Sequence, residues 1–363
     1  MTTVTQKTQP LSVERPAAHS RPRTLRLAWI ALAVALVSVF LLSVALGSVN
    51  IPLNEVLTTL LGGEPARASW RTIIMDFRLP KAFTAVLAGA ALAVSGLQMQ
   101  TLFRNPLADP FVLGINAGAS LGVALVVLSV GTPGAAVLAG LGLIGDLSLT
   151  AAAVIGAALI MALVLLVARR VASATTLLVL GLMFGYATGA LVSLLMYFSI
   201  PERIQAYINW GYGSFGGVTW EQMTILAPGL LIGLALSWTT AKPLNALLLG
   251  EDYARSMGVN IRYARITIIA GSALLAGTVT AFCGPIGFLG VAVPHLCRTL
   301  FRTSDHRLLI PACVMMGALC ALTADLVART PGNEIVLPLN AVTALLGAPV
   351  VAWVILRKRN FRV

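Results

Sequence analysis

The sequence predicts an all-α polytopic membrane protein with about ten transmembrane helices. Hydrophobic residues make up 58% of the 363 residues, charged residues make up 10%, and the mean hydropathy is +0.90. So few polar side chains cannot cover the surface of a water-soluble globule. A hydrocarbon core about 30 Å thick needs about 20 apolar residues per helix, so a chain of this length with short loops accommodates about ten spans.

The apolar segments supply that number, five in each half of the chain. The expected spans run near residues 27–49, 82–103, 111–130, 147–167, 176–198, 223–240, 261–282, 285–300, 308–328 and 337–356. The eighth segment differs from the others, because it begins G-P-I-G-F-L-G and contains Pro294. A kinked or partly unwound half-helix is expected there, buried where protein or water satisfies the freed backbone groups.

The first 26 residues hold five basic residues against one acid and contain no apolar run. This composition predicts a disordered basic arm. The apolar segment that follows is longer than the core of a cleaved signal peptide, which has about 7–15 residues, so we expect it to remain as the first span. The expected organisation is therefore an arm at 1–26, a ten-helix membrane domain at 27–356 and a basic tail at 357–363.

The distribution of basic residues predicts the topology. Of the 25 Lys and Arg residues, 19 fall on the side of the two termini and six on the other side. The positive-inside rule then places both termini in the cytoplasm. Because the excess lies in short loops beside apolar spans, the net charge of +12 indicates topology rather than a nucleic-acid partner.

The residues that carry chemistry do not form a catalytic or metal site in the sequence. The four cysteines lie in or beside spans without a C-x-x-C pair, which argues against a disulfide framework and a zinc site. Three histidines are scattered, and no lysine follows a glycine as the ATP-binding P-loop requires. We therefore expect no catalytic residue, metal or cofactor on this chain, and expect any driving ATP to bind another chain.

Asp325 is the ionisable residue that stands out within an apolar segment. Carboxylates at such positions are candidates for proton coupling, which would make the protein a secondary transporter. Arg329 follows four residues later, so on a helix the two side chains share a face and can form an ion pair near the external interface. We favour the ion pair and keep the proton-coupled transporter as the alternative.

Glycines recur every four residues on the third and fifth expected spans. Such faces allow close approach of helices. Tight packing within the chain is the favoured interpretation, while a subunit interface or a substrate path could use the same smooth surface. The glycines are Gly114, Gly118 and Gly122 on the third span and Gly181, Gly185 and Gly189 on the fifth.

Two polar interruptions lie on the expected cytoplasmic side. Residues 104–110 read R-N-P-L-A-D-P, and residues 248–260 read L-L-G-E-D-Y-A-R-S-M-G-V-N. The second pattern predicts a short mixed-charge helix begun and ended by glycines, at about 246–258. Such a helix could dock into the groove of a partner or lie in the lipid interface.

These motifs, in this order, resemble the permease subunits of ABC importers for iron siderophores, heme and vitamin B12, the FecCD-type family. The motifs that match are R-L-P-K at 78–81, G-A-A-L-A-V-S-G at 89–96, residues 104–110, residues 249–259, G-P-I-G-F at 284–288, V-P-H at 293–295, A-D at 324–325 and L-L-G-A-P at 345–349. The resemblance implies a type II importer permease that forms a homodimer in a bacterial cytoplasmic (inner) membrane. It also implies two cytoplasmic ATPases that bind ATP and Mg²⁺, and an extracytoplasmic substrate-binding protein.

The resemblance further implies roles for residues at matching positions. Docking of the binding protein falls to Arg78, Lys81 and Arg329. Coupling to the ATPase falls to Leu249, Gly250, Glu251, Ala254, Arg255 and Gly258. A cytoplasmic gate is expected at Asn105, Leu107, Ala174 and Thr175. Lysine at position 81 departs from the commoner arginine and cannot form the same two-pronged hydrogen bond.

The expected translocation path follows one face of the fifth span. It offers Met183, Tyr186, Ser193, Met196 and Tyr197, with no cation between Arg170 and Arg203. Such a wall would let a bulky ligand slide, and it disfavours a carboxylate-rich ligand such as heme. Residues 210–220 are similar to vitamin B12 permeases, but iron chelates are the commonest cargo of the family, so a ferric siderophore is expected and heme or vitamin B12 are the alternatives.

Overall fold

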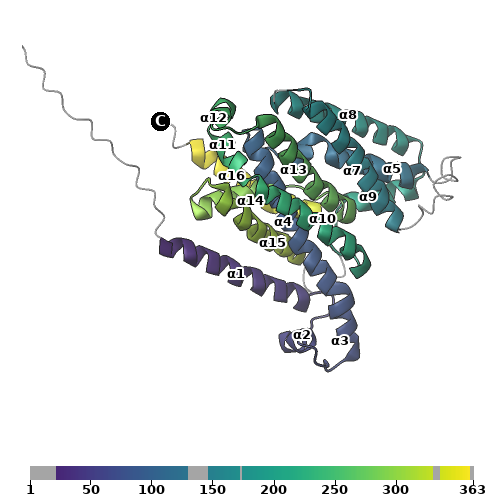
Figure 1. Ribbon diagram of the computed structural model, residues 1–363. Helices are drawn as coiled ribbons and strands as arrows, with labels where there is room; N and C mark the ends of the chain where they lie inside the picture. The colour runs from purple at the N-terminus through teal and green to yellow at the C-terminus, as the bar shows by residue number, and fades with distance from the viewer. Residues whose placement is uncertain (1–21, 130–145, 172–173, 330–335, 360–363) are drawn as a thin grey trace, which may run out of the picture.

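The computed structural model describes residues 22–129, 146–171, 174–329 and 336–359, and the regular elements of these residues are all helices (Figure 1). Seven of these helices are long and apolar enough to span a membrane. Three shorter apolar helices fall at the third, eighth and tenth expected spans. The all-α polytopic fold predicted from the sequence is confirmed.

In chain order, the helices are α1 (Pro22–Ala45), α2 (Leu53–Leu60), α3 (Ala68–Thr72), α4 (Leu79–Leu102), α5 (Ile115–Ser129), α7 (Asp146–Ala168), α8 (Ala174–Tyr197), α9 (Pro201–Gly211), α10 (Trp220–Thr239), α11 (Ala241–Leu248), α12 (Glu251–Ser256), α13 (Ile261–Cys283), α14 (Leu289–Phe301), α15 (His306–Ala328) and α16 (Leu339–Arg359). A π-helical segment (Ile73–Arg78) joins α3 to α4, and a short 3-10 turn (Pro110–Leu113) precedes α5.

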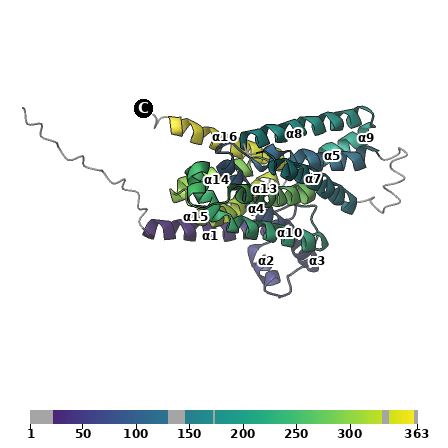
Figure 2. The ribbon, with the colours of Figure 1, turned by 45° about the horizontal axis from the view of Figure 1, so that its top comes forward.

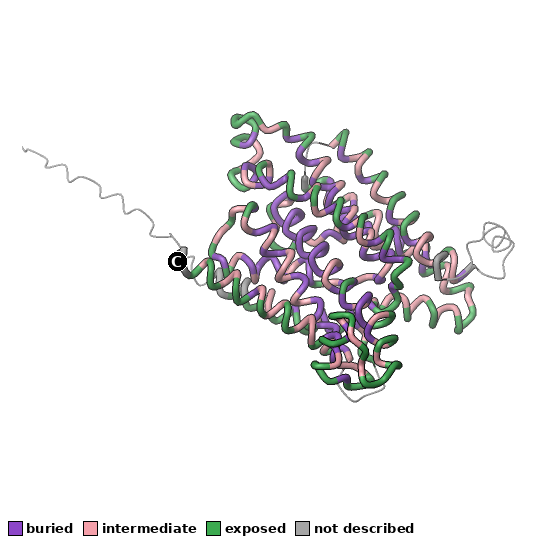
Figure 3. The backbone as a smooth tube through the Cα atoms, turned by 60° about the horizontal axis from the view of Figure 1, so that its bottom comes forward, coloured by how far each residue is buried: buried purple, intermediate pink, exposed green. Residues whose placement is uncertain are grey.

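Helix α4 forms the centre of the bundle. Of its most apolar stretch, 83% is buried, against 17% for α1 at the edge, and Figure 3 shows buried residues concentrated in the middle of the molecule. The small residues of the 89–96 motif explain this position. A Cβ added at Gly96 would lie 2.5 Å from the Cα of Gly290 on α14, and one at Gly317 on α15 would lie 2.8 Å from the carbonyl carbon of Gly89. Glycine therefore lets both helices approach α4 backbone to backbone.

Helices α5, α7 and α8 lie together on the side of the bundle away from α1 (Figures 1 and 2). On α5, a Cβ added at Gly122 would lie 2.9 Å from the carbonyl carbon of Ala152, so this glycine face packs tightly against α7 as expected. The glycines of α8 divide between two environments. Gly181 packs against Leu113, whereas Gly185 and Gly189 have no atom within 4 Å of an added Cβ.

The boundaries of the chain differ in places from those expected. Helix α1 begins at Pro22, so the last five residues of the expected arm are helical, and the remainder lies outside the described residues. Helices α2, α3 and α9 were not expected, because they are too short to register as spans. The predicted short helix is present as α12 between Gly250 and Gly258, and α11 precedes it as a separate helix.

The start of α14 is unwound as predicted. Gly284 has a φ of +71° and Phe288 a φ of +67°, and the residues between them are not helical. The freed backbone groups find partners within the protein: Ser214 N–H donates to the Cys283 carbonyl at 2.8 Å, and Gly287 N–H donates to Asn340 Oδ1 at 3.0 Å. This arrangement satisfies the requirement that irregular backbone in a membrane be buried in protein.

Candidate functional site

The loop at 104–110 is fixed on α14 by side-chain hydrogen bonds. A ring nitrogen of His295 lies 2.8 Å from the Pro106 carbonyl oxygen. Gln100, at the end of α4, donates to the Gly290 carbonyl at 3.3 Å and accepts from Arg298 Nη1 at 2.6 Å. These bonds hold the loop and the end of α4 against α14.

Two of the expected gate residues lie on this loop. Asn105 Oδ1 accepts a hydrogen bond from Leu107 N–H at 3.0 Å, which orders a turn, and the Leu107 side chain is exposed. Asp109 closes the loop by accepting from Phe111 N–H at 2.8 Å. Burial among protein atoms raises the pKa of Asp109 to about 6, although the hydrogen bond from Phe111 acts in the opposite direction.

The other two expected gate residues lie at the start of α8. Ala174 is the first residue of the helix, and Thr175, the second, is exposed. The side chain of Ala174 lies outside the described residues. The gate therefore stays a prediction.

Helix α12 presents an unusual surface. Gly250 precedes it with a φ of +111°, a conformation that favours glycine. Ala254 is fully buried, whereas Leu249, Tyr253 and Met257 are each more than half exposed and recur every four residues. Arg255 is exposed on the same short helix. Ala254 therefore packs on the protein, while Asp252, Tyr253 and Arg255 of α12 are exposed, with the exposed apolar side chains of Leu249 and Met257 just before and just after the helix.

A polar network joins α11 to α4 and α15. His306, at the start of α15, places one ring nitrogen 2.8 Å from Thr101 Oγ1 and the other 2.8 Å from Asn245 Oδ1. Asn245 Nδ2 donates to Asp305 Oδ1 at 2.6 Å. Partial burial opposes ionisation of Asp305, but hydrogen bonds from Arg307 N–H and Asn245 prevail and hold its pKa below the ordinary value. The network ties α11 to the end of α4 that leads into the 104–110 loop.

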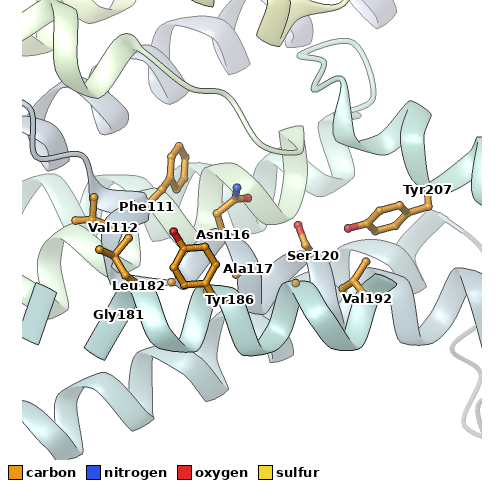
Figure 4. A pocket seen from close by; sticks show the side chains of 13 residues that line it. Phe111, Val112, Asn116, Ala117, Ser120, Gly181, Leu182, Tyr186, Val192 and Tyr207 are labelled. Carbon is orange, nitrogen blue, oxygen red and sulfur yellow. The ribbon is translucent and has the colours of Figure 1, made fainter. Parts of the chain in front are cut away.

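A cavity of about 430 Å³ opens between α5 and α8 (Figure 4). Four side chains bring polar atoms to it: Asn116, Ser120, Tyr186 and Tyr207. The hydroxyls of Ser120 and Tyr207 share a hydrogen bond, while Asn116 Oδ1 is buried and has no hydrogen-bond partner among the residues that the structure describes. None of the described residues that line the cavity is charged. The cavity can therefore hold a ligand through neutral hydrogen bonds and apolar contact.

Only Tyr186, of the five expected path residues, lines this cavity. Met183 and Tyr197 are exposed, Met196 packs against α5, and Ser193 donates its hydroxyl to the Gly189 carbonyl at 3.0 Å. Asn116 and Ser120 of α5 and Tyr207 of α9 were missed. The signal for the first two was present, because polar residues four apart on an apolar span mark one face.

Arg78 has a structural position. Its side chain is buried, and its guanidinium donates to the carbonyls of Val44 at 2.8 Å and Ala45 at 2.7 Å and also to that of Val49. The first two carbonyls belong to the last turn of α1, where a helix leaves carbonyls unsatisfied and favours a cation, and the third lies just after it. Arg78 is thus occupied within the chain, and its expected contact with a binding protein stays a prediction.

Asp325 lies between two cations. Its side chain is 5% exposed, with Lys81 Nζ at 3.0 Å from Oδ1 and the Arg329 guanidinium against Oδ2. Arg329 also donates to Ser43 Oγ at 3.1 Å. The predicted pair of Asp325 with Arg329 is confirmed, and the contact with Lys81 was not anticipated. Two of the expected docking residues are therefore held by one carboxylate.

Comparison with known proteins identifies the class. A family model described as the FecCD transport family matches residues 34–357. The vitamin B12 import system permease protein BtuC of Klebsiella pneumoniae is 38% identical over 343 residues, covering 94% of this chain and 97% of its own length. The protein of the same name from Escherichia coli O9:H4 is 39% identical over 292 residues, covering 79% and 84%.

Solved structures agree on the fold. A metal-chelate type ABC transporter, described in an inward-facing conformation, superposes with a TM-score of 0.77 at 28% identity, covering 93% of this chain and 99% of the other. PsaBC from Streptococcus pneumoniae, solved in complex with Fab, superposes with a TM-score of 0.50 at 15% identity and supports the fold alone. The fold of this chain is therefore that of a known transporter architecture.

Proposed function

The chain belongs to the FecCD transport family, and from this membership we propose that it is the permease subunit of a binding-protein-dependent importer driven by ATP hydrolysis on a partner chain. ATP and Mg²⁺ are bound by that partner, and this chain supplies the path and the docking surface. The protein is a multi-pass component of a bacterial cytoplasmic membrane. The positive-inside rule orients its termini and α12 toward the cytoplasm.

The observation that carries this proposal is the exposed face of α12. Tyr253 on α12, and Leu249 and Met257 at its two ends, are each more than half exposed beside the exposed charges of Asp252 and Arg255, while Ala254 packs on the protein. A short exposed helix with apolar side chains on and beside it can dock into a hydrophobic groove of a partner. Since α12 lies on the cytoplasmic side of the proposed topology, the partner with such a groove is the ATPase.

The cargo we propose is a bulky metal chelate that is uncharged where it contacts the permease. Neutral polar groups line the cavity between α5 and α8, and a ligand that exposes carboxylates, such as heme, would find no cation among them. Cobalamin is the first candidate, because the relatives from Klebsiella pneumoniae and Escherichia coli are named for vitamin B12. A ferric siderophore is the second, because the similar solved structure is of the metal-chelate type.

We further propose that two copies enclose the path. Only 22% of the apolar stretch of α8 is buried, and Gly185 and Gly189 on this helix are unpacked. A second copy facing α8 would turn the open cavity into an enclosed passage. The binding protein would dock at the opposite end from α12, near α2 and α3, where Arg67 and Arg71 are exposed and can attract acidic side chains.

The proton-coupled alternative finds no support in the geometry. A proton relay needs a carboxylate that gains and loses a proton during the cycle, with acidic or histidine partners at depth. Asp325 instead lies in ion pairs with Lys81 and Arg329, and neither partner is an acidic or histidine side chain. A structural ion-pair cluster accounts for these three residues.

The test is reconstitution with partners. The chain would be co-expressed with candidate ATPases, placed in lipid vesicles and assayed for ATP hydrolysis with a binding protein loaded with cobalamin, ferric siderophore or heme. We expect a stable complex whose hydrolysis rises with one loaded ligand, cobalamin first. Absence of association with any ATPase, together with ligand uptake driven by a pH gradient, would overturn the proposal.

A further inference from the structure

Arg265 on α13 makes two contacts that connect separate helices. Its Nη2 lies 2.8 Å from Oε1 of Glu251, the first residue of α12. Its Nη1 donates to the Val171 carbonyl at 3.2 Å. The Arg265 side chain is 6% exposed, whereas the Glu251 side chain is 37% exposed. One buried guanidinium thus touches α12 on one side and the end of α7 on the other.

The contact with Val171 lies where a cation is favourable. Val171 lies three residues after the end of α7, and its own N–H donates to the Val167 carbonyl at 3.0 Å, which keeps it attached to the last turn of that helix. Carbonyls at a helix end carry partial negative charge and attract a guanidinium. Arg265 therefore anchors the end of α7, three residues before α8 begins at Ala174.

The ion pair between Arg265 and Glu251 connects α12 to another helix, α13. Among the described residues, the other ion pair of this helix is internal, between Asp252 and Arg255 at 3.9 Å, and both partners are exposed. Arg265, by contrast, is desolvated and holds Glu251 by a charge-assisted bond, the stronger kind of hydrogen bond. A displacement of α12 should therefore also displace Arg265, through the bond to Glu251.

We propose that Arg265 is a positioning residue that joins the docking helix α12 to the cytoplasmic end of α7, so that movement of α12 is transmitted to α7 and to the start of α8. The inference rests on the proposed function, because it assumes that α12 is the helix that the ATPase moves. It assigns the Glu251 carboxylate to a contact within the permease rather than to a contact with the ATPase. The planar fork of arginine suits this role, since it can bond a carboxylate and a carbonyl at once.

The test compares three variants in the reconstituted complex with ATPase and loaded binding protein. Arg265→Gln removes both contacts, Glu251→Ala removes the contact with α12 alone, and Glu251→Gln keeps an acceptor oxygen for Arg265. The matched control is Arg262→Gln, an exposed arginine one turn earlier on α13. Each complex is assayed for ATPase association, ATP hydrolysis and ligand uptake, and the result is expressed as ligand taken up per ATP hydrolysed.

We expect association and hydrolysis within about twofold of wild type in Arg265→Gln and Arg262→Gln. Uptake per ATP should fall at least fivefold in Arg265→Gln and Glu251→Ala, less in Glu251→Gln, and stay unchanged in Arg262→Gln. A fluorescent label on Thr175→Cys, at the exposed start of α8, reports transmission directly. The label should respond to ATP in the wild-type background and lose that response in Arg265→Gln, which a purely structural role of Arg265 would not produce.

Three results would overturn the inference. Unchanged uptake per ATP in Arg265→Gln and Glu251→Ala would show that the link carries nothing. Loss of ATPase association in Glu251→Ala would return Glu251 to the docking surface. An unaltered Thr175 label response in Arg265→Gln would leave Arg265 a packing residue. Failure of the wild-type chain to bind an ATPase would refute the proposed function instead, and that outcome is read before any variant is tested.

Discussion

The crossing of α4 and α14 at Gly96 gives a prediction whose size follows from the structure. A Cβ at this position would lie 2.5 Å from the Gly290 Cα, with the Gly290 carbonyl carbon and oxygen closer still. These are backbone atoms and cannot rotate away. Because carbon atoms make their best contact at about 3.5–4.0 Å, Gly96→Ala requires the two helices to separate by about 1 Å.

The cost of that separation can be isolated with a second glycine. Gly185 on α8 is also helical, but a Cβ there meets no atom within 4 Å. Both substitutions gain up to about 1 kcal/mol of helix propensity, whereas only Gly96→Ala overpacks the interior, which costs about 1–3 kcal/mol. The free energies of unfolding of the two variants should therefore differ by about 1–3 kcal/mol, with Gly96→Ala the less stable.

Thermal unfolding of both purified variants in the same detergent measures this difference. At about 2 °C per kcal/mol for a chain of this size, Gly96→Ala should unfold about 2–6 °C below Gly185→Ala. The displacement should also weaken the bond from Gln100 to the Gly290 carbonyl and loosen the 104–110 loop. Equal Tm values for the two variants would show that α14 shifts freely and would refute the argument from close packing.

Three further predictions concern charge and backbone conformation. Asp325→Asn leaves Lys81 and Arg329 without their carboxylate, and breaking a buried pair should lower the free energy of unfolding by about 3 kcal/mol and thus the Tm. Uptake per folded protein should be retained. Lost uptake at an unchanged Tm would instead support proton coupling. In Asp109 the folded-state pKa of about 6 exceeds the ordinary 3.8, so stability should fall by up to about 3 kcal/mol as the pH rises from about 4 to 6. Asp109→Asn should remove that slope, and persistence of the slope in thermal unfolding at pH 4–7 would contradict the assignment. Gly250→Ala forces a side chain onto a φ of +111° and should weaken ATPase pull-down through about 1–3 kcal/mol of backbone strain. The control Gly217→Ala, in an open loop, should leave pull-down unchanged. Equal pull-down by the two variants would contradict this prediction.

Most of the fold could be predicted from the sequence, because hydropathy and glycine spacing are properties of short continuous segments. The ten spans, the unwound start of α14 and the helix between Gly250 and Gly258 all follow from apolar length, from proline and glycine, and from turn-forming residues. Hydropathy and glycine spacing do not predict short amphipathic helices such as α2 and α9. Their apolar residues are too few to mark a span, and their positions depend on neighbours that are distant in sequence.

The site was less predictable, because its contacts join residues far apart in the chain. Asp325 and Arg329 are four residues apart, and their pairing was foreseeable, but Lys81 reaches the same carboxylate from 244 positions earlier. Arg265 resembles an ordinary loop-flanking basic residue until the fold brings Val171 and Glu251 to it. Arg78 shows the opposite case, in which a residue expected on the surface is drawn inward by the carbonyls of α1.

The wall of the cavity bears on where cargo selection resides. A net contribution of about 0.5–1.5 kcal/mol for each neutral hydrogen bond means that Asn116, Ser120, Tyr186 and Tyr207 together provide weak retention. The bond that Ser120 and Tyr207 already share reduces it further, because a ligand must compete for those hydroxyls. Weak retention suits a path that must release its ligand, but it discriminates poorly between chelates of similar size. If the chain works as proposed, selectivity must therefore come from the binding protein, and exchanging that partner should change the cargo more than substituting any of these four residues.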